Sequence, residues 1–158
     1  MLSDKALDRI DVLILSRLQE NAKLTVRELA DELGLSQTPI YERIKKLERT
    51  GVIKKYIALL NAQKLEMGLM VYMTINVQDP SSPDMYSMIA ELKAKSEVVE
   101  LYQITGDSDY LAVVRTKDLK SYKELLLNDF GNMIKIKEIF SYIVLDRAKF
   151  TTAVPIAS

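Results

Sequence analysis

The stretch of residues 24–53 constrains the fold of this chain most, because it holds start and end signals of short helices close together. Thr25 can cap the first of these helices, and Glu28 three residues later completes a capping box. Gly34 suits the end of that helix, since glycine readily takes the positive φ that helix C-termini favour. The stretch therefore begins with a short helix that ends in a tight turn.

A second helix is expected directly after this turn. Thr38 can cap it, Pro39 can occupy its first position without losing a hydrogen bond, and Gly51 closes it. Apolar residues with helical spacing mark its buried face: Ile40, Ile44 and Leu47. The residues expected to point away are Tyr41, Glu42, Lys45 and Arg49. Two short helices with exposed cations on the second are typical of a helix-turn-helix DNA-binding module.

An earlier helix completes a three-helix module. Asp8 can cap it, and Asp11 can close a capping box at the third helical position. Its core-facing stripe is expected to comprise Ile10, Leu13, Ile14 and Leu18. Spacing alone leaves open an ordinary helical subdomain whose charged face is merely solvated.

The distribution of charge favours DNA. Between Ser36 and Tyr56 there are six basic and two acidic residues, an excess of +4 in a chain of zero formal net charge, whereas residues 57–158 carry 11 basic and 13 acidic residues. Positive charge is thus confined to the N-terminal module, where it can bind phosphate. The candidates to reach base edges are Gln37, Thr38, Tyr41, Glu42 and Lys45. The candidates for phosphate or structural contacts are Arg43, Lys46 and Arg49.

The composition excludes several classes of protein. Without cysteine and histidine the chain lacks thiolate metal ligands, the commonest zinc ligand and the commonest general base, so we expect no catalysis, metal or resident cofactor. No run approaches the ~20 apolar residues of a membrane span. The N-terminus also lacks a basic region followed by an apolar stretch, so we expect a cytoplasmic protein without a membrane partner.

The second half of the chain changes from helical to alternating periodicity. From Leu69 to Val77 every odd-numbered residue is apolar, as a strand with one buried face requires. A loop then leads into a helix that Ser82 is expected to cap, with Pro83 at its first position. Two further strands are expected at Glu97–Thr105 and Tyr110–Thr116, joined as a hairpin by a short turn.

A second helix is expected from Asp118 to Phe130 and a last strand from Ile134 to Leu145. The inner face of that helix is expected to comprise Leu119, Tyr122, Leu126 and Phe130. The order βαββαβ predicts a four-stranded antiparallel sheet with both helices on one face, the ferredoxin-like arrangement. The predicted class is α+β, with a helix-turn-helix domain at residues 1–53, a linker strand and hinge at 54–68, and the ferredoxin-like domain at 69–150.

Two segments are more apolar than a single chain of this plan can bury. Lys54–Asn61 is too apolar for a free linker, so we expect it to pair as a strand. The last strand is apolar on both faces after Ile139, and two helices on one side cannot cover its other side. A self-complementary interface with a second copy would cover it. Cover by the C-terminal tail is the alternative.

These features together resemble the Lrp/AsnC family, the leucine-responsive or feast/famine transcription regulators. The resemblance covers nearly the whole chain, from about Leu7 to Arg147. It rests on motifs that are individually weak but specific in their order and spacing: Leu7–Asp11, Glu28–Ala30, Gly34–Ser36, Arg43–Glu48, Gly51–Ile53, Tyr56–Asn61 and Gly106–Leu111.

The resemblance implies a dimer with paired linker strands and face-to-face sheets, which can associate into tetramers or octamers. It also implies an amino-acid effector bound between dimers, close to the turn after the second strand. The corresponding residues here are Gly106, Asp107, Asp109, Tyr110, Ser141 and Tyr142. A glycine-containing turn can offer N–H donors to a carboxylate, and its acidic residues can hold an ammonium. The residues alone leave open a plain hairpin turn with self-capping aspartates.

We therefore expect a sequence-specific DNA-binding transcription regulator whose C-terminal domain binds a small amino acid and drives oligomerisation. Its expected partners are double-stranded DNA, further copies of itself and the amino acid. The alternative is an architectural protein that wraps DNA without an effector. An enzyme or enzyme-regulatory subunit is the least favoured class, because histidine, cysteine and a phosphate-cradling glycine loop are absent.

Overall fold

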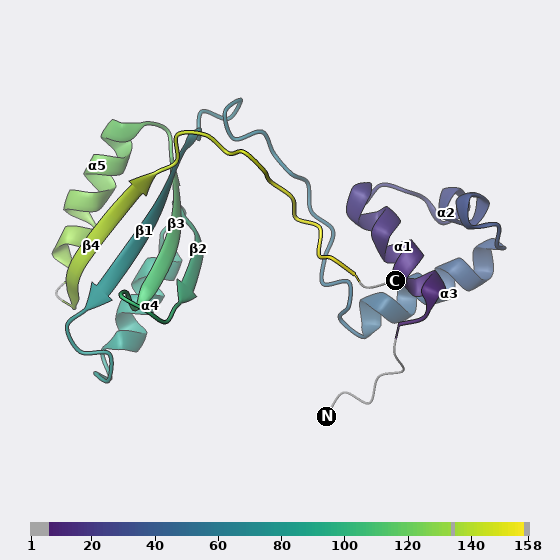
Figure 1. Ribbon diagram of the computed structural model, residues 1–158, viewed down its shortest axis with the longest axis horizontal. Coiled ribbons are helices and arrows are strands. Elements are labelled where there is room, and N and C mark those ends of the chain that lie inside the picture. Colours follow the sequence, from purple (N-terminus) through teal and green to yellow (C-terminus); the bar gives the residue numbers. More distant parts are fainter. Residues whose placement is uncertain (1–6, 134, 157–158) are drawn as a thin grey trace. The chain divides into compact units, whose positions relative to one another are not determined.

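The computed structural model describes residues 7–133 and 135–156, which divide into two compact units. Residues up to Leu59 and from Lys149 onward make the helical domain, and Leu60–Ala148 make the sheet domain. The C-terminal tail therefore belongs with the helices, although the last strand belongs with the sheet (Figure 1). No helix in the described ranges is long and apolar enough to cross a membrane.

The helices of the helical domain are α1 (Arg9–Glu20), α2 (Val26–Leu33) and α3 (Gln37–Arg49). Both predicted capping boxes are confirmed. The Asp8 carboxylate accepts a bond from the Asp11 N–H, and the Asp11 carboxylate accepts one from the Asp8 N–H. Thr25 and Glu28 are bonded reciprocally in the same way. Gly34 ends α2 with φ of 66°, as predicted.

The predicted start of α3 is wrong by two residues. Ser36, not Thr38, occupies the cap position, so the helix begins at Gln37 and Pro39 is its third residue. Proline is tolerated there for the same reason as at the first position, because N–H groups of the first turn have no partner within the helix. The Ser36 side chain makes no capping hydrogen bond.

The three helices share one small core. Its buried residues are Ile14, Leu15, Leu29, Ala30, Ile40, Ile44 and Leu47. The prediction that Leu13 faces this core is wrong, since 40% of Leu13 is exposed. The buried stripe of α1 instead follows Asp11, Ile14 and Leu15, with Leu18 partly buried at the next turn. The buried aspartate Asp11 occupies one position of this stripe, so the pattern of apolar residues alone could not identify the buried face of α1.

The C-terminal tail is an unpredicted part of the helical domain. The Gln19 side chain donates to the Val154 carbonyl at 3.2 Å and accepts from the Val154 N–H at 2.6 Å. Ile156 packs against the helical core. These contacts bring residues after the last strand back onto α1.

The sheet domain follows the predicted βαββαβ order. Its elements are β1 (Leu69–Val77), α4 (Met85–Ala94), β2 (Val98–Gln103), β3 (Tyr110–Thr116), α5 (Leu119–Asn128), a 3-10 turn η1 (Phe130–Asn132) and β4 (Ile136–Ile143). The sheet order is β2-β3-β1-β4, and all three strand pairs are antiparallel. The predicted α+β class is confirmed. Ile134, the expected first residue of the last strand, lies outside the described residues.

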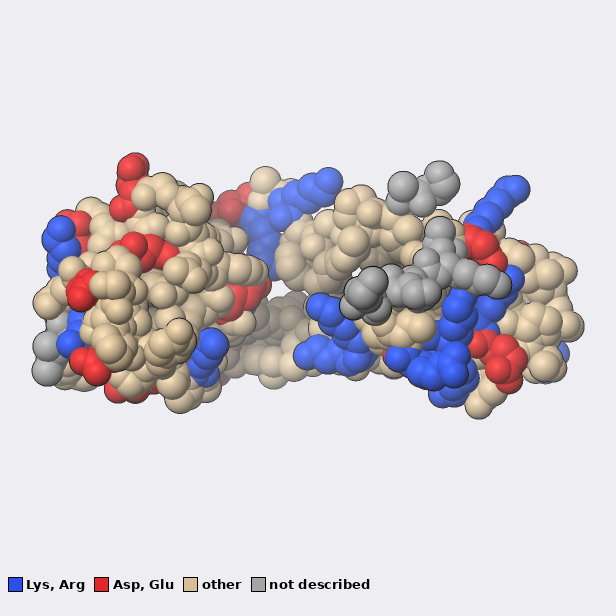
Figure 2. All heavy atoms as spheres, turned by 90° about the horizontal axis from the view of Figure 1, so that it is seen from below, with Lys and Arg blue, Asp and Glu red and all other residues tan. Residues whose placement is uncertain are grey.

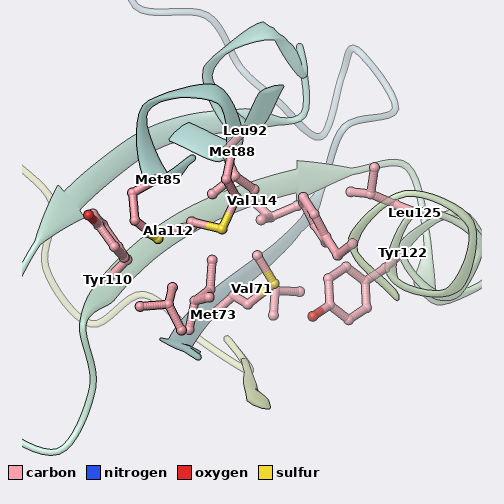
Figure 3. Close-up of a cluster of buried hydrophobic side chains, with 13 residues drawn as sticks. Val71, Met73, Met85, Met88, Leu92, Tyr110, Ala112, Val114, Tyr122 and Leu125 are labelled. Carbon is pink, nitrogen blue, oxygen red and sulfur yellow. The ribbon is translucent and has the colours of Figure 1, made fainter. Parts of the chain in front are cut away.

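Both helices cover one face of the sheet. Met85, Met88 and Leu92 of α4 and Tyr122 and Leu125 of α5 pack against inward side chains of the central strands (Figure 3). Two helix details differ from the prediction. Asp84, not Ser82, occupies the cap position of α4. Leu119 is 58% exposed because it is the first residue of α5 and lies outside the stripe that contains Tyr122 and Leu125.

The opposite side of the sheet, called here the uncovered face, carries large exposed side chains. Tyr72 pairs with Tyr142 and Thr74 with Phe140 across β1 and β4, whereas Ser141 and its odd-numbered neighbours face the helices. The exposed aromatic residues of this face are Tyr72 (40%), Tyr102 (49%), Phe140 (45%) and Tyr142 (57%). Because these side chains remain exposed, the alternative in which the tail covers them is wrong for the described residues.

The linker is extended and exposed. Residues 54–60 take part in no strand pair within the described chain, so the expected pairing does not occur inside one copy. Its apolar side chains remain accessible: Tyr56 (47%), Ile57 (58%), Leu59 (62%) and Leu60 (72%). The short turn expected before the first strand is present at residues 62–66.

Candidate DNA-binding surface and effector site

All eight residues proposed to contact DNA lie on α3. The helix buries its apolar side, which leaves the opposite side to solvent. Residues exposed there are Gln37, Thr38, Tyr41, Glu42, Lys45 and Arg49, and Lys46 is half-buried. Basic side chains gather on the face of the helical domain that Figure 2 presents on the right, whereas both signs are scattered over the sheet domain on the left.

Arg43 has a structural position. Its Nη1 atom lies 2.6 Å from Asp8 and 2.7 Å from the buried carboxylate of Asp11, so it joins α3 to the start of α1. Hydrogen bonds to these two carboxylates raise the pKa of Arg43. The Asp11 N–H and Arg43 together lower the pKa of Asp8. A guanidinium held this way is poorly placed to bind a phosphate.

The remaining cations of α3 differ in their surroundings. The Lys45 ammonium pairs with Glu48 at 2.9 Å and lies 5.7 Å from the centre of the Tyr41 ring. The Glu48 hydrogen bond raises the pKa of Lys45. Lys46 and Arg49 form no ion pair in the part of the chain that the structure describes. These two are therefore the cations of α3 best able to meet phosphates.

The turn between β2 and β3 is tied to the end of β1. Gly106 adopts φ of 121°, a conformation that favours glycine. The Asp109 N–H donates to the Ile75 carbonyl at 3.1 Å, and the Asp109 carboxylate accepts from the Val77 N–H at 2.9 Å. Asp109 thus fixes the turn, while Asp107 is exposed and forms no hydrogen bond or ion pair among the described residues.

The other predicted effector residues are not brought together. Tyr110 is only 8% exposed and belongs to the sheet core. The Ser141 hydroxyl is hydrogen-bonded to the Tyr122 hydroxyl at 2.5 Å on the helix side of the sheet. Tyr142 lies on the uncovered face. Because Ser141 and Tyr142 point to opposite faces of the sheet, one chain alone does not bring their side chains together beside the turn.

Asn76 is a polar residue near this turn that the sequence did not indicate. Its Oδ1 atom is buried and has no hydrogen-bond partner among the described residues. It precedes Val77, where the pairing of β1 with β4 shifts register. A buried acceptor without a donor is costly, so a donor from outside the single chain would stabilise it.

One partly open hollow of the sheet domain lies away from the turn. A cavity of about 310 Å³ is lined by residues around the start of β1 and the end of β4, including Met70 and Val144. Arg115 and Arg147 approach the Met70 sulfur there at 3.7 and 3.1 Å. No cluster of metal-ligating side chains occurs in residues 7–133 and 135–156.

Comparison with known proteins decides the family. Residues 7–54 match the winged helix-turn-helix DNA-binding model, and residues 70–154 match the Lrp/AsnC ligand binding domain. This chain belongs to the Lrp/AsnC family. The predicted identity as a DNA-binding transcription regulator with a ligand-binding domain, and not an enzyme, is confirmed.

Individual relatives agree with this assignment. The chain is 37% identical over 149 residues to the leucine-responsive regulatory protein of Haemophilus influenzae, covering 94% of this chain and 89% of that protein. A Neisseria meningitidis transcriptional regulator, solved in complex with L-Met, matches with a TM-score of 0.90 at 30% identity, covering 94% and 96% of the two chains. Escherichia coli AsnC matches with a TM-score of 0.88 at 25% identity, covering 96% and 100%.

Proposed function

We propose that this Lrp/AsnC regulator reads DNA sequence with α3 in the major groove. The observation that carries the proposal is the exposed face of α3, which combines cations with polar and aromatic side chains on a helix-turn-helix scaffold. Helix-turn-helix proteins contact base edges chiefly with N-terminal residues of the second helix. The residues assigned to base edges are accordingly Gln37, Thr38, Tyr41, Glu42 and Lys45. Lys46 and Arg49 bind phosphates, and Arg43 supports the fold.

Mobility shifts over a range of salt concentrations test this assignment. Replacing Lys45, Lys46 and Arg49 together by alanine removes three cations, so affinity falls for all sequences and the salt dependence flattens by up to about three units of slope. The matched control replaces three exposed lysines of the sheet domain, Lys93, Lys120 and Lys123, and leaves binding unchanged. Equal affinity of the wild type and the α3 variant would show that α3 does not contact DNA.

We propose further that the ligand is a free amino acid bound at the Gly106–Asp109 turn. The Neisseria relative solved with L-Met supports this ligand class. A free amino acid needs N–H donors for its carboxylate and acceptors for its ammonium. The turn offers backbone N–H groups and the exposed carboxylate of Asp107, which forms no ion pair among the described residues. Gly106 and Asp107 are exposed on one chain, which supports a pocket that a second dimer closes.

Calorimetry with the twenty amino acids tests the ligand proposal. We expect Asp107→Asn to weaken binding of whichever amino acid binds the wild type, and Asp109→Ala to weaken it while also loosening the turn. Glu91→Gln, an equal charge change on the surface of α4, is the control. Absence of binding at millimolar concentration would favour the architectural alternative, and unchanged binding by both aspartate variants would move the site elsewhere.

The oligomeric state is part of the same proposal. We infer a dimer in which the uncovered faces pack together and the linkers pair as strands, and which associates further when the ligand binds. The exposed aromatic residues of the uncovered face and the unpaired apolar linker support it. Because the ligand site is shared, ligand binding and assembly strengthen each other reciprocally.

A further inference from the structure

Glu48 lies between the DNA-binding face of α3 and the linker. One of its carboxylate oxygens accepts from the Lys45 ammonium at 2.9 Å, and the other accepts from the Tyr56 hydroxyl at 3.1 Å. Lys45 also lies over the Tyr41 ring. A continuous chain of contacts therefore runs from two residues assigned to base edges, through Glu48, to the linker.

These contacts set the charge and position of Lys45. The bond to Lys45 lowers the pKa of Glu48, so Glu48 remains a carboxylate over the physiological range. An ammonium paired with a carboxylate attracts phosphates less than an unpaired one, because the pair presents less net charge. Side chains of Lys45 and Glu48 are 53% and 31% exposed, so DNA can reach the pair.

Tyr56 holds the Glu48 carboxylate, which in turn holds the Lys45 ammonium. Its hydroxyl is bonded to Glu48, and burial followed by this bond raises the pKa of Tyr56. Tyr56 belongs to the extended linker that leads to the sheet domain. A shift of the linker at Tyr56 would release one oxygen of Glu48 and allow its side chain to change rotamer.

We infer that Glu48 and Tyr56 are positioning residues that hold Lys45 in the orientation for base recognition and restrain it from indiscriminate phosphate binding. This inference rests on the proposed role of α3 in DNA binding. The linker would then influence sequence discrimination directly, because its residue Tyr56 is hydrogen-bonded to Glu48 of α3. A change of assembly that moves the linker would alter discrimination without any contact between ligand and DNA.

Double-mutant cycles test the inference on the full-length protein. Affinities are measured by fluorescence anisotropy for an operator selected from random DNA and for an unrelated duplex. Glu48→Gln should strengthen binding to the unrelated duplex and reduce the ratio of specific to non-specific affinity. Tyr56→Phe should reduce the same ratio while leaving the salt dependence unchanged, because it alters no charge.

The decisive comparison uses Lys45→Ala as the background. If Glu48 acts through Lys45, the excess effect of Glu48→Gln disappears when Lys45 is absent, with a coupling of about threefold or more, as in other hydrogen-bonded networks. Glu42→Gln is the matched control, because it changes the same charge on the same helix, but Glu42 forms no ion pair or hydrogen bond with Lys45 among the described residues. Its effect should add independently to that of Lys45→Ala.

Two outcomes would overturn the inference. One is additivity of Glu48→Gln and Lys45→Ala, and the other is an unchanged affinity ratio in Tyr56→Phe when its melting temperature matches the wild type. Either result stands apart from failure of the proposed function, which would appear as unchanged DNA binding after replacement of all three α3 cations. If Tyr56→Phe melts at a lower temperature than the wild type, both proteins are measured below the melting transition of the variant. The ratio of specific to non-specific affinity then tests the inference in the same way.

Discussion

Two carboxylates, rather than a contact with DNA, account for the role that we assign to Arg43. Asp11 is almost completely buried, and its charge is compensated by the Arg43 guanidinium and by the N–H of Asp8. Removing one partner of such a pair leaves an uncompensated charge, which costs far more than the pair contributes. The interaction therefore locks the start of α1 against α3.

Arg43→Ala should destabilise the helical domain by about 2 kcal/mol, below the range for fully buried pairs because solvent reaches Arg43. Arg43→Lys should lie between this variant and the wild type, since lysine keeps the charge but loses the planar fork. Denaturant unfolding followed by circular dichroism measures the difference. Arg49→Ala, which removes an exposed cation of the same helix, should not change stability. Equal stability of Arg43→Ala and Arg49→Ala would contradict this assignment.

Asp8 makes the stability of the same contact depend on pH. Hydrogen bonding from the Asp11 N–H, aided by Arg43, lowers its pKa in the folded protein below the usual 3.8. A depressed pKa contributes stability that is present above the unfolded value and is lost as pH falls through the folded value. Asp8→Asn should therefore be less stable than the wild type at pH 7, with the difference shrinking from about pH 4 downward. A constant difference down to pH 2 would contradict the coupling.

At the level of elements, local signals predicted far more than distant ones. The caps at Asp8, Thr25 and Gly34 depend on residues within one helical turn, and all three were predictable. The faces presented by Ser141 and Tyr142 depend on the register of β4 against β1, which no local pattern determines. Tyr110 begins a strand, and only its pairing with Ile75 shows that its side chain enters the core. The residues predicted for the effector site therefore include Tyr110, Ser141 and Tyr142, whose side chains the fold of one chain places apart.

The contact of the C-terminal tail with α1 could not be predicted from the sequence, because it joins residues that are far apart in the chain. Gln19→Ala removes both bonds to the Val154 backbone, so it should lower the stability of the helical domain by about 1 kcal/mol, since the contact is exposed. Hydrogen exchange should report reduced protection in α1 and unchanged protection in the sheet domain. Gln37→Ala, which removes an exposed glutamine of α3, is the control. Equal exchange in both variants would show that the tail contact contributes nothing.

For the whole molecule, the two faces of the sheet have unlike environments. One is buried under α4 and α5, while the other exposes four aromatic side chains. The linker adds further exposed apolar residues and an extended backbone without a strand partner in the described chain. Large exposed apolar surfaces mark interaction sites. A second copy would satisfy both features at once, because a self-complementary interface presents the same residues twice.

The wild-type protein should therefore be a dimer or larger at micromolar concentration, as measured by sedimentation velocity. Tyr142→Glu introduces a charge into the proposed interface, which should weaken association by several kcal/mol and shift the protein toward monomer. Tyr86→Glu makes the same change at a tyrosine of α4 that is 83% exposed, outside the uncovered face, and should leave the assembly intact. DNA affinity should fall only in the Tyr142 variant, since helix-turn-helix dimers bind two half-sites together. A monomeric wild type, or equal assembly of both tyrosine variants, would exclude the uncovered face as the interface.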